Sequence, residues 1–244
     1  MNTPAPHRQG IYLLPNLLTT AALAAGFYAI TATVAGHHSV AAGAILIAFI
    51  LDGLDGRVAR LTGTESAFGA HYDSLADMVS FGVAPALMAL LWALAAHGRI
   101  GTALAFLFVA AVALRLARFN SQSGVADKRW FQGLPSPAGA GMVASLVWLM
   151  QAHGLDAQRT PVVLVLLPVI AALMVSKLRY TSFKGFDPAG RVPFLGVLAI
   201  VLGLAVAFTT PALVTFLLFA GYTISGPALT LRQRARLRAG RQRG

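Results

Sequence analysis

The chain has 244 residues, of which 57% are hydrophobic and 11% are charged, and its formal net charge is +11. Soluble domains carry about 25% charged residues, so this composition excludes an ordinary soluble domain with one core. The absence of cysteine excludes disulfides and thiolate metal sites.

Apolar stretches of near-membrane length recur along the chain, and a helical crossing of a bilayer needs about 20 apolar residues. The sequence therefore predicts an all-α fold, a polytopic transmembrane helical bundle of about eight spans, in a single domain of residues 1–244. The first apolar segment is too long for a signal peptide and no cleavage site follows it, so it is a retained span. The expected spans lie near 13–35, 39–61, 73–97, 100–119, 135–153, 160–177, 192–208 and 211–230.

Basic residues are distributed unevenly around these spans. If the spans alternate in direction, every lysine and arginine except Arg99 and Arg159 falls on one side, including the arginine-rich tail 232–244. The positive-inside rule places that side, with both termini, in the cytoplasm. Basic residues beside a span also attract anionic lipid headgroups, so the net charge is explained by a membrane and no nucleic-acid partner is expected.

Acidic residues gather in the second and third predicted spans. Of the eight acidic residues in the chain, five lie within positions 52–77, namely Asp52, Asp55, Glu65, Asp73 and Asp77. Ionisable groups at membrane depth are costly unless they are paired, solvated or metal-bound, so they indicate a functional site. Asp52 and Asp55 are three residues apart and Asp73 and Asp77 are four apart, which places each pair on one face of a helix.

The segment 61–64 separates the two pairs and is typical of a helix end followed by a turn. A hairpin at this turn brings four carboxylates together, and their mutual repulsion requires a compensating charge. Carboxylate ligands without cysteine favour hard ions such as Mg²⁺ or Mn²⁺ over Zn²⁺. We therefore predict a site for one or two divalent cations.

Small residues accompany the first pair. Taking 100° per residue, Asp52, Gly56 and Ala59 lie within about 60° of one another on the helix. Arg60 beside them supplies a permanent cation suited to phosphate. Taken singly, the small residues are equally well explained by close helix packing. Together with the aspartates and the arginine, they indicate a pocket in which metal and arginine hold a diphosphate.

The combined pattern resembles the signature of the CDP-alcohol phosphotransferases. At every fixed position the chain matches Asp52-x2-Asp55-Gly56-x2-Ala59-Arg60-x8-Gly69-x3-Asp73-x3-Asp77. Further segments are similar to the phosphatidylserine synthase branch of that family, namely residues 14–19, 72–82, 114–120, 131–137 and 177–180. The resemblance covers residues 13 to about 190, which is the expected catalytic core.

The resemblance implies transfer of a phosphatidyl group from CDP-diacylglycerol to the hydroxyl of L-serine, with release of CMP. It implies an enzyme of the cell inner (cytoplasmic) membrane, with its active site on the cytoplasmic side, and a homodimer. By position, Asp52, Asp55, Asp73 and Asp77 would hold two divalent metal ions, and Asp77 would also be the catalytic base. The residues that would contact CDP-diacylglycerol are Gly56, Ala59, Arg60, Ser66 and Gly69, with Asn16 as a weaker candidate. Helix capping or interhelical hydrogen bonding is an equal explanation for Ser66 and Asn16.

Recognition of serine requires a partner for its carboxylate, and an arginine can bind a carboxylate through two hydrogen bonds. The candidates are Arg115, Arg118, Lys177 and Arg179. We expect Arg118 with Asn120 to bind serine, because Arg118 lies at the cytoplasmic end of a predicted span. For most of the four candidates, the positive-inside rule is a sufficient explanation of their position beside the membrane.

Two alternatives remain open at this point. A sister transferase would use another acceptor, such as glycerol 3-phosphate or an inositol phosphate, and would differ in its acceptor pocket rather than in its aspartates. A divalent-cation transporter would also bury acidic residues in a helical bundle. The gathering of the four aspartates in one half of one hairpin argues against a continuous ion path.

Overall fold

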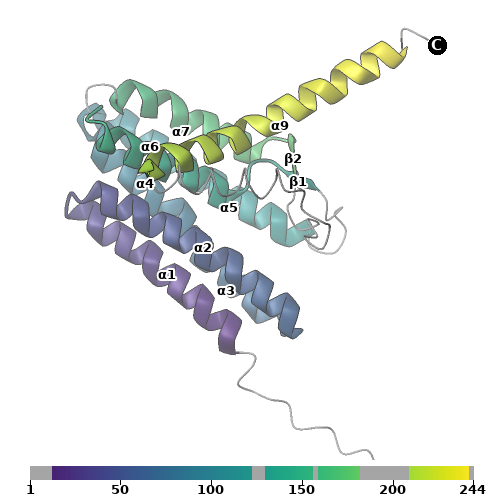
Figure 1. Ribbon diagram of the computed structural model, residues 1–244, viewed down its shortest axis with the longest axis horizontal. Helices are drawn as coiled ribbons and strands as arrows, with labels where there is room; N and C mark the ends of the chain where they lie inside the picture. The colour runs from purple at the N-terminus through teal and green to yellow at the C-terminus, as the bar shows by residue number, and fades with distance from the viewer. Residues whose placement is uncertain (1–12, 123–129, 156–158, 182–208, 242–244) are drawn as a thin grey trace, which may run out of the picture.

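A computed structural model of the chain describes residues 13–122, 130–155, 159–181 and 209–241, which form a bundle of helices (Figure 1). The α-helices are α1 (Leu13–Val34), α2 (His38–Thr62), α3 (Ala67–Asp77), α4 (Ala84–Ala89), α5 (Gly98–Gln122), α6 (Ser136–Ala152), α7 (Arg159–Val175) and α9 (Pro211–Arg241). Two π-helical turns, η2 (Met78–Val83) and η3 (Leu90–Leu94), and the 3-10 turn η4 (Ala95–His97) connect α3 to α5 through α4. The predicted helical architecture is confirmed.

Four helical stretches are long and apolar enough to cross a membrane, namely Leu13–Val34, His38–Thr62, Ala67–Ser121 and Pro211–Leu231. The third has 55 residues, well above the length of one crossing, and Gly98 with φ 51° lies within it. Beyond Gly98, α5 packs back against α4 and η3. Helices α6 and α7 have 17 residues each, and the predicted span at 192–208 lies outside the described residues. The count of eight spans therefore stays a prediction.

The hairpin that carries the aspartates is formed by α2 and α3. Helix α2 ends at Thr62, and Gly63 follows with φ 64°, a conformation that suits glycine because it has no Cβ. The Thr64 amide then donates to the Ala59 carbonyl at 3.0 Å. The predicted turn at 61–64 is thus confirmed. The second arm begins at Ala67 and not at residue 73, because the side chain of the preceding serine caps a helix start that hydropathy alone does not mark.

Helix α1 lies along α2 and also contacts α3 and η2 (Figure 1). The close approach to η2 depends on Gly26, where an added Cβ would overlap Ser80 Oγ and crowd its backbone. The Ser80 hydroxyl donates to the Ala22 carbonyl at 3.1 Å. Small residues allow helices in a membrane to pack this closely, so α1 forms a fixed wall beside the aspartate hairpin.

A two-stranded antiparallel sheet was not predicted. Strands β1 (Trp130–Gln132) and β2 (Arg179–Thr181) pair across a long sequence separation, and three residues are too few to show a strand period. Tyr180 in β2 is fully buried, and its hydroxyl donates to the Thr223 carbonyl of α9 at 3.1 Å. Its ring occupies the space that a Cβ at Gly226 would take. The sheet thereby fastens α9, which extends beyond the bundle in Figure 1, to the rest of the fold.

Candidate metal and phosphate site

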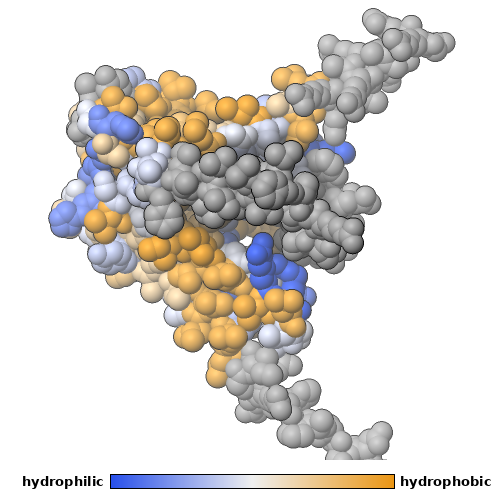
Figure 2. Space-filling view, in the orientation of Figure 1, coloured by the Kyte–Doolittle hydropathy of each residue, from blue (hydrophilic) through white to orange (hydrophobic). Residues whose placement is uncertain are grey.

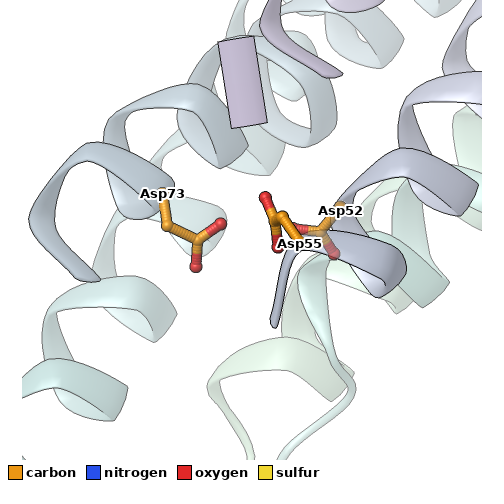
Figure 3. A group of neighbouring side chains, drawn as sticks. All are labelled: Asp52, Asp55 and Asp73. Atoms are coloured by element: carbon orange, nitrogen blue, oxygen red, sulfur yellow. The ribbon is translucent and has the colours of Figure 1, made fainter. Parts of the chain in front are cut away.

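Three carboxylates converge between α2 and α3 (Figure 3). One oxygen each of Asp52, Asp55 and Asp73 lies within 4.8 Å of the other two. Asp52 and Asp55 come from one helix, and the carboxyl group of Asp73 points toward them from the neighbouring helix. Asp55 is 5% exposed, while Asp52 and Asp73 are half-buried. The structure therefore places three of the four predicted aspartates in one group, two of them partly exposed.

Helix α1 contributes a hydrogen-bond donor to this group. Thr19 Oγ1 donates to Asp55 Oδ2 at 2.6 Å and lies 3.1 Å from the Pro15 carbonyl oxygen. Both Thr19 and Asp55 are buried, so this bond is shielded from water. A hydrogen bond to one carboxylate oxygen leaves the other oxygen oriented for a second partner. Thr19 therefore fixes the direction in which Asp55 presents its carboxylate.

The fourth aspartate lies on the inner side of the group. Asp77 is the last residue of α3, is 9% exposed, and interacts with Asp52 and Asp73. Arg115 of α5 is 8% exposed, and its charge acts on both Asp77 and Asp52. Its Nη1 donates to the hydroxyl of the fully buried Ser136 at 2.7 Å. A buried cation at this place offsets part of the repulsion among the carboxylates.

The residues expected to bind the nucleotide surround the start of α3. A Cβ at Gly69 would lie 3.2 Å from Ser66 Oγ and 3.5 Å from Asn16 Oδ1, so both polar groups lie over the bare backbone of this glycine. The Ser66 hydroxyl also accepts from the Gly69 amide at 3.0 Å, which is the capping role considered as an alternative. On α2, a Cβ at Gly56 would lie 3.5 Å from Nη1 of Arg60.

The surface around these residues is partly hydrophilic and borders an apolar surface. Figure 2 shows hydrophilic residues gathered at the end of the bundle where α2 and α3 meet. Exposed charged residues here include Arg57, Arg60 and Glu65, while Ala59 is half-buried on the same turn of α2 as Arg60. A polar, partly basic entrance at a membrane-facing bundle is suited to an anionic headgroup.

The acceptor residues preferred from the sequence are engaged in contacts within the protein. Arg118 Nη1 donates to the Val175 carbonyl at 3.0 Å and to the Ser176 carbonyl at 3.4 Å, at the end of α7. Asn120 Nδ2 donates to Ser74 Oγ at 3.0 Å and so joins the end of α5 to α3. The other two basic candidates, Lys177 and Arg179, are exposed.

The donor set of the aspartate group fits a hard divalent cation. Oxygens around Mg²⁺ lie about 2.1 Å from the ion and hence up to about 4.2 Å from one another. The oxygens of Asp52, Asp55 and Asp73 are within 4.8 Å, so only small side-chain movements separate them from a coordinating arrangement. Carboxylate oxygens are the ligands that Mg²⁺ and Mn²⁺ prefer, and the described residues around the site include no thiolate.

Three residues near the site were missed from the sequence. Thr19 lies in the similar segment 14–19, but its own signal was only a hydroxyl in an apolar span. Ser136 lies in the similar segment 131–137 but was not singled out, and Tyr222 carried no signal, because their relation to Arg115 depends on how α5, α6 and α9 pack together. Tyr222 of α9 lies beyond the residues that the resemblance covers, and its phenol acts on the Arg115 charge.

Comparisons with known proteins agree with this geometry. Residues 12–178 match the CDP-alcohol phosphatidyltransferase family. A CDP-diacylglycerol–serine O-phosphatidyltransferase of Helicobacter pylori is 42% identical over 175 residues, which cover 71% of this chain and 74% of the relative. A protein of the same name from Mycobacterium tuberculosis is 39% identical over 155 residues, covering 60% and 54%. An archaetidylserine synthase of Methanothermobacter thermautotrophicus is 34% identical over 175 residues, covering 70% and 71%.

Proposed function

The chain belongs to the CDP-alcohol phosphatidyltransferase family, and we propose that it transfers the phosphatidyl group of CDP-diacylglycerol to the hydroxyl of L-serine, giving phosphatidylserine and CMP. The observation that carries this proposal is the convergence of Asp52, Asp55 and Asp73 beside a basic, glycine-lined entrance. Serine as the acceptor is supported by the relatives, whose names differ in the lipid part but agree on serine.

The carboxylates of Asp52, Asp55, Asp73 and Asp77 would hold two divalent ions, Mg²⁺ or Mn²⁺. When bound, these ions would supply positive charge to the diphosphate of the donor and so stabilise the departing CMP. Thr19 holds Asp55 in one orientation through its hydrogen bond of 2.6 Å. The family in general depends on divalent metals, in agreement with this donor set.

The donor lipid would lie with its nucleotide over the start of α3. Gly56, Ala59 and Gly69 leave the backbone accessible, and Asn16 and Ser66 offer polar atoms beside it. Arg60 is exposed on α2, with its Nη1 beside Gly56, and would pair with phosphate oxygens. The acyl chains remain in the bilayer around the apolar faces of α1 and α2, which expose large hydrophobic side chains such as Leu17 and Ile50.

The acceptor reacts on the inner side of the group, where Asp77 is the base. Asp77 removes the proton of the serine hydroxyl while the hydroxyl oxygen of serine forms a bond to the phosphorus of the phosphatidyl group. The bond from that phosphorus to the bridging oxygen breaks, and the electron pair leaves with CMP. Arg118 and Asn120 form the adjoining wall between α5, α3 and the end of α7.

This chemistry fits a particular placement in the membrane. We propose an inner-membrane enzyme with both termini and the active site on the cytoplasmic side, acting as a homodimer of single-domain chains. Water-soluble serine and the product CMP then exchange directly with the cytoplasm, while both lipids stay in the bilayer.

The test is CMP release from CDP-diacylglycerol by the purified full-length protein in detergent micelles. We expect release that requires both L-serine and Mg²⁺ or Mn²⁺, and that falls below detection in Asp73→Asn. If serine is inert while glycerol 3-phosphate or an inositol phosphate reacts, the protein is a sister transferase. Metal flux into proteoliposomes without CMP release would instead indicate a transporter.

A further inference from the structure

The guanidinium of Arg115 is buried without a full set of hydrogen-bond partners. Its Nη1 is held by Ser136 at 2.7 Å, and Ser136 is itself fully buried. Its Nε has no hydrogen-bond partner among the residues that the structure describes, although the side chain is only 8% exposed. Buried donors of charged groups are normally paired, so an unpaired Nε at this depth calls for an explanation.

The surroundings of Arg115 place it beside the reacting centre. The groups on which its charge acts are Asp77, Tyr222 and Asp52, which belong to three different helices. The Ser136 contact fixes one side of the planar guanidinium and thus the orientation of its other edge. That edge, formed by Nε–H and an Nη–H, is the fork that pairs with a carboxylate through two parallel hydrogen bonds.

Resting on the proposed function, we propose that Arg115 binds the carboxylate of the acceptor amino acid and so holds its hydroxyl at Asp77. The hydroxyl and carboxylate of serine are close neighbours on a small molecule. One serine can therefore meet both a base and a carboxylate receptor only where the two are neighbours, and the charges of Asp77 and Arg115 are close enough to act on each other.

Arg118, the residue expected from the sequence, is less suited to this role. Its Nη1 is occupied by the carbonyls of Val175 and Ser176, which end α7. These contacts secure the wall of the acceptor side. Arg118 therefore maintains the shape of the pocket, and Arg115 provides selectivity.

A competing explanation is that Arg115 only balances the negative charge of the aspartates. The two roles differ in how they depend on the acceptor. A counter-ion supports the reaction with any acceptor alcohol to the same extent. A carboxylate receptor supports only acceptors that carry a carboxylate, so the comparison of L-serine with ethanolamine, which lacks that group, separates the two.

The experiment measures kcat/KM for L-serine and for ethanolamine in full-length Arg115→Met. The matched control is Arg99→Met, because Arg99 is an exposed arginine at the other end of α5. We expect Arg115→Met to lower kcat/KM for serine by about 10- to 100-fold, mainly through KM, which is the loss typical of a hydrogen bond to a charged group. The rate with ethanolamine registers only the loss of the buried charge, so it should fall by at least about tenfold less than the rate with serine. Arg99→Met should match the wild type with both acceptors.

Binding of radiolabelled L-serine to the metal-loaded protein gives a second readout that does not depend on turnover. Serine binding should be lost in Arg115→Met. It should be weakened in Arg115→Lys, because lysine keeps the charge but cannot form two parallel hydrogen bonds. The lysine variant also tests the proposal if Arg115→Met does not fold. An equal loss of activity with both acceptors, or unchanged serine binding, would overturn the proposal. A serine-specific loss in Arg118→Met alone would assign the carboxylate to Arg118. A wild-type protein inert toward serine would refute the proposed function itself.

Discussion

Replacing Thr19 by valine tests whether Asp55 is a metal ligand. The substitution removes the hydroxyl that donates to Asp55 Oδ2 at 2.6 Å and keeps the size of the side chain nearly unchanged. A buried hydrogen bond to a charged group contributes about 1.5–3 kcal/mol. Because about 1.4 kcal/mol corresponds to a factor of ten, metal affinity should fall by about 10- to 100-fold, the range seen for other residues that orient metal ligands.

The assay is CMP release as a function of Mg²⁺ or Mn²⁺ concentration. Thr19→Val should shift the half-maximal metal concentration upward by that factor and recover most of its activity at saturating metal. Thr102→Val is the matched control, because the Thr102 hydroxyl also bonds the carbonyl four residues earlier but contacts no carboxylate in the described part of the chain. A lower maximal rate with an unchanged metal dependence would contradict the assignment of Asp55.

Three further outcomes are expected. Asp77→Asn should lower kcat at saturating metal and serine by about 10²- to 10⁴-fold, as measured by CMP release, because the base is lost. Gly226→Ala should lower the melting temperature in detergent, because the added Cβ overlaps the Tyr180 ring. The expected shift is about 2–4 °C for each kcal/mol of unfolding free energy lost. Gly221→Ala on the same helix is the control, since its Cβ meets no atom within 4 Å and should leave the melting temperature unchanged. Burial and the neighbouring phenol raise the pKa of Tyr180 to about 12 from 10.0. The stability that this raised pKa gives is present below pH 10 and is lost as the pH rises toward 12. The melting temperature should therefore fall more steeply between pH 10 and 12 in the wild type than in Tyr180→Phe. Parallel pH profiles of the two proteins would contradict this.

The sequence was sufficient for the parts of the site that depend on local spacing. Asp52 and Asp55 share a helical face because they are three residues apart, and a turn with a glycine returns the chain to Asp73. Local spacing could not bring Gly69 and Asn16 together, because they belong to different helices, and only the family resemblance assigned both to the nucleotide. Local periodicity therefore predicted which side chains share a face, while the partners across helices required the fold.

The acceptor side was predicted less well for a physical reason. Arg118 and Arg115 are three residues apart on the same helix. The sequence does not show which of them donates to carbonyl groups at the end of another helix and which acts on the carboxylates. The distinction comes from α6, which offers Ser136 to Arg115, and from the end of α7, which offers carbonyls to Arg118. The two-stranded sheet was missed for the same reason, because its strands pair only in three dimensions.

The π-helical turn η2 begins directly after Asp77 and has a wider backbone than an α-helix. Such a turn behaves as a single inserted residue, and it changes the phase of the helix by about 100°. The turn therefore lets α3 orient its carboxylates toward α2 while α4 orients its side chains toward the core, although the two helices are continuous. Deleting one residue from 78–83 would close the turn into a regular helix and rotate one half against the other. Catalysis and packing could then no longer both be satisfied, so the length of this segment is as much a part of the active site as its aspartates.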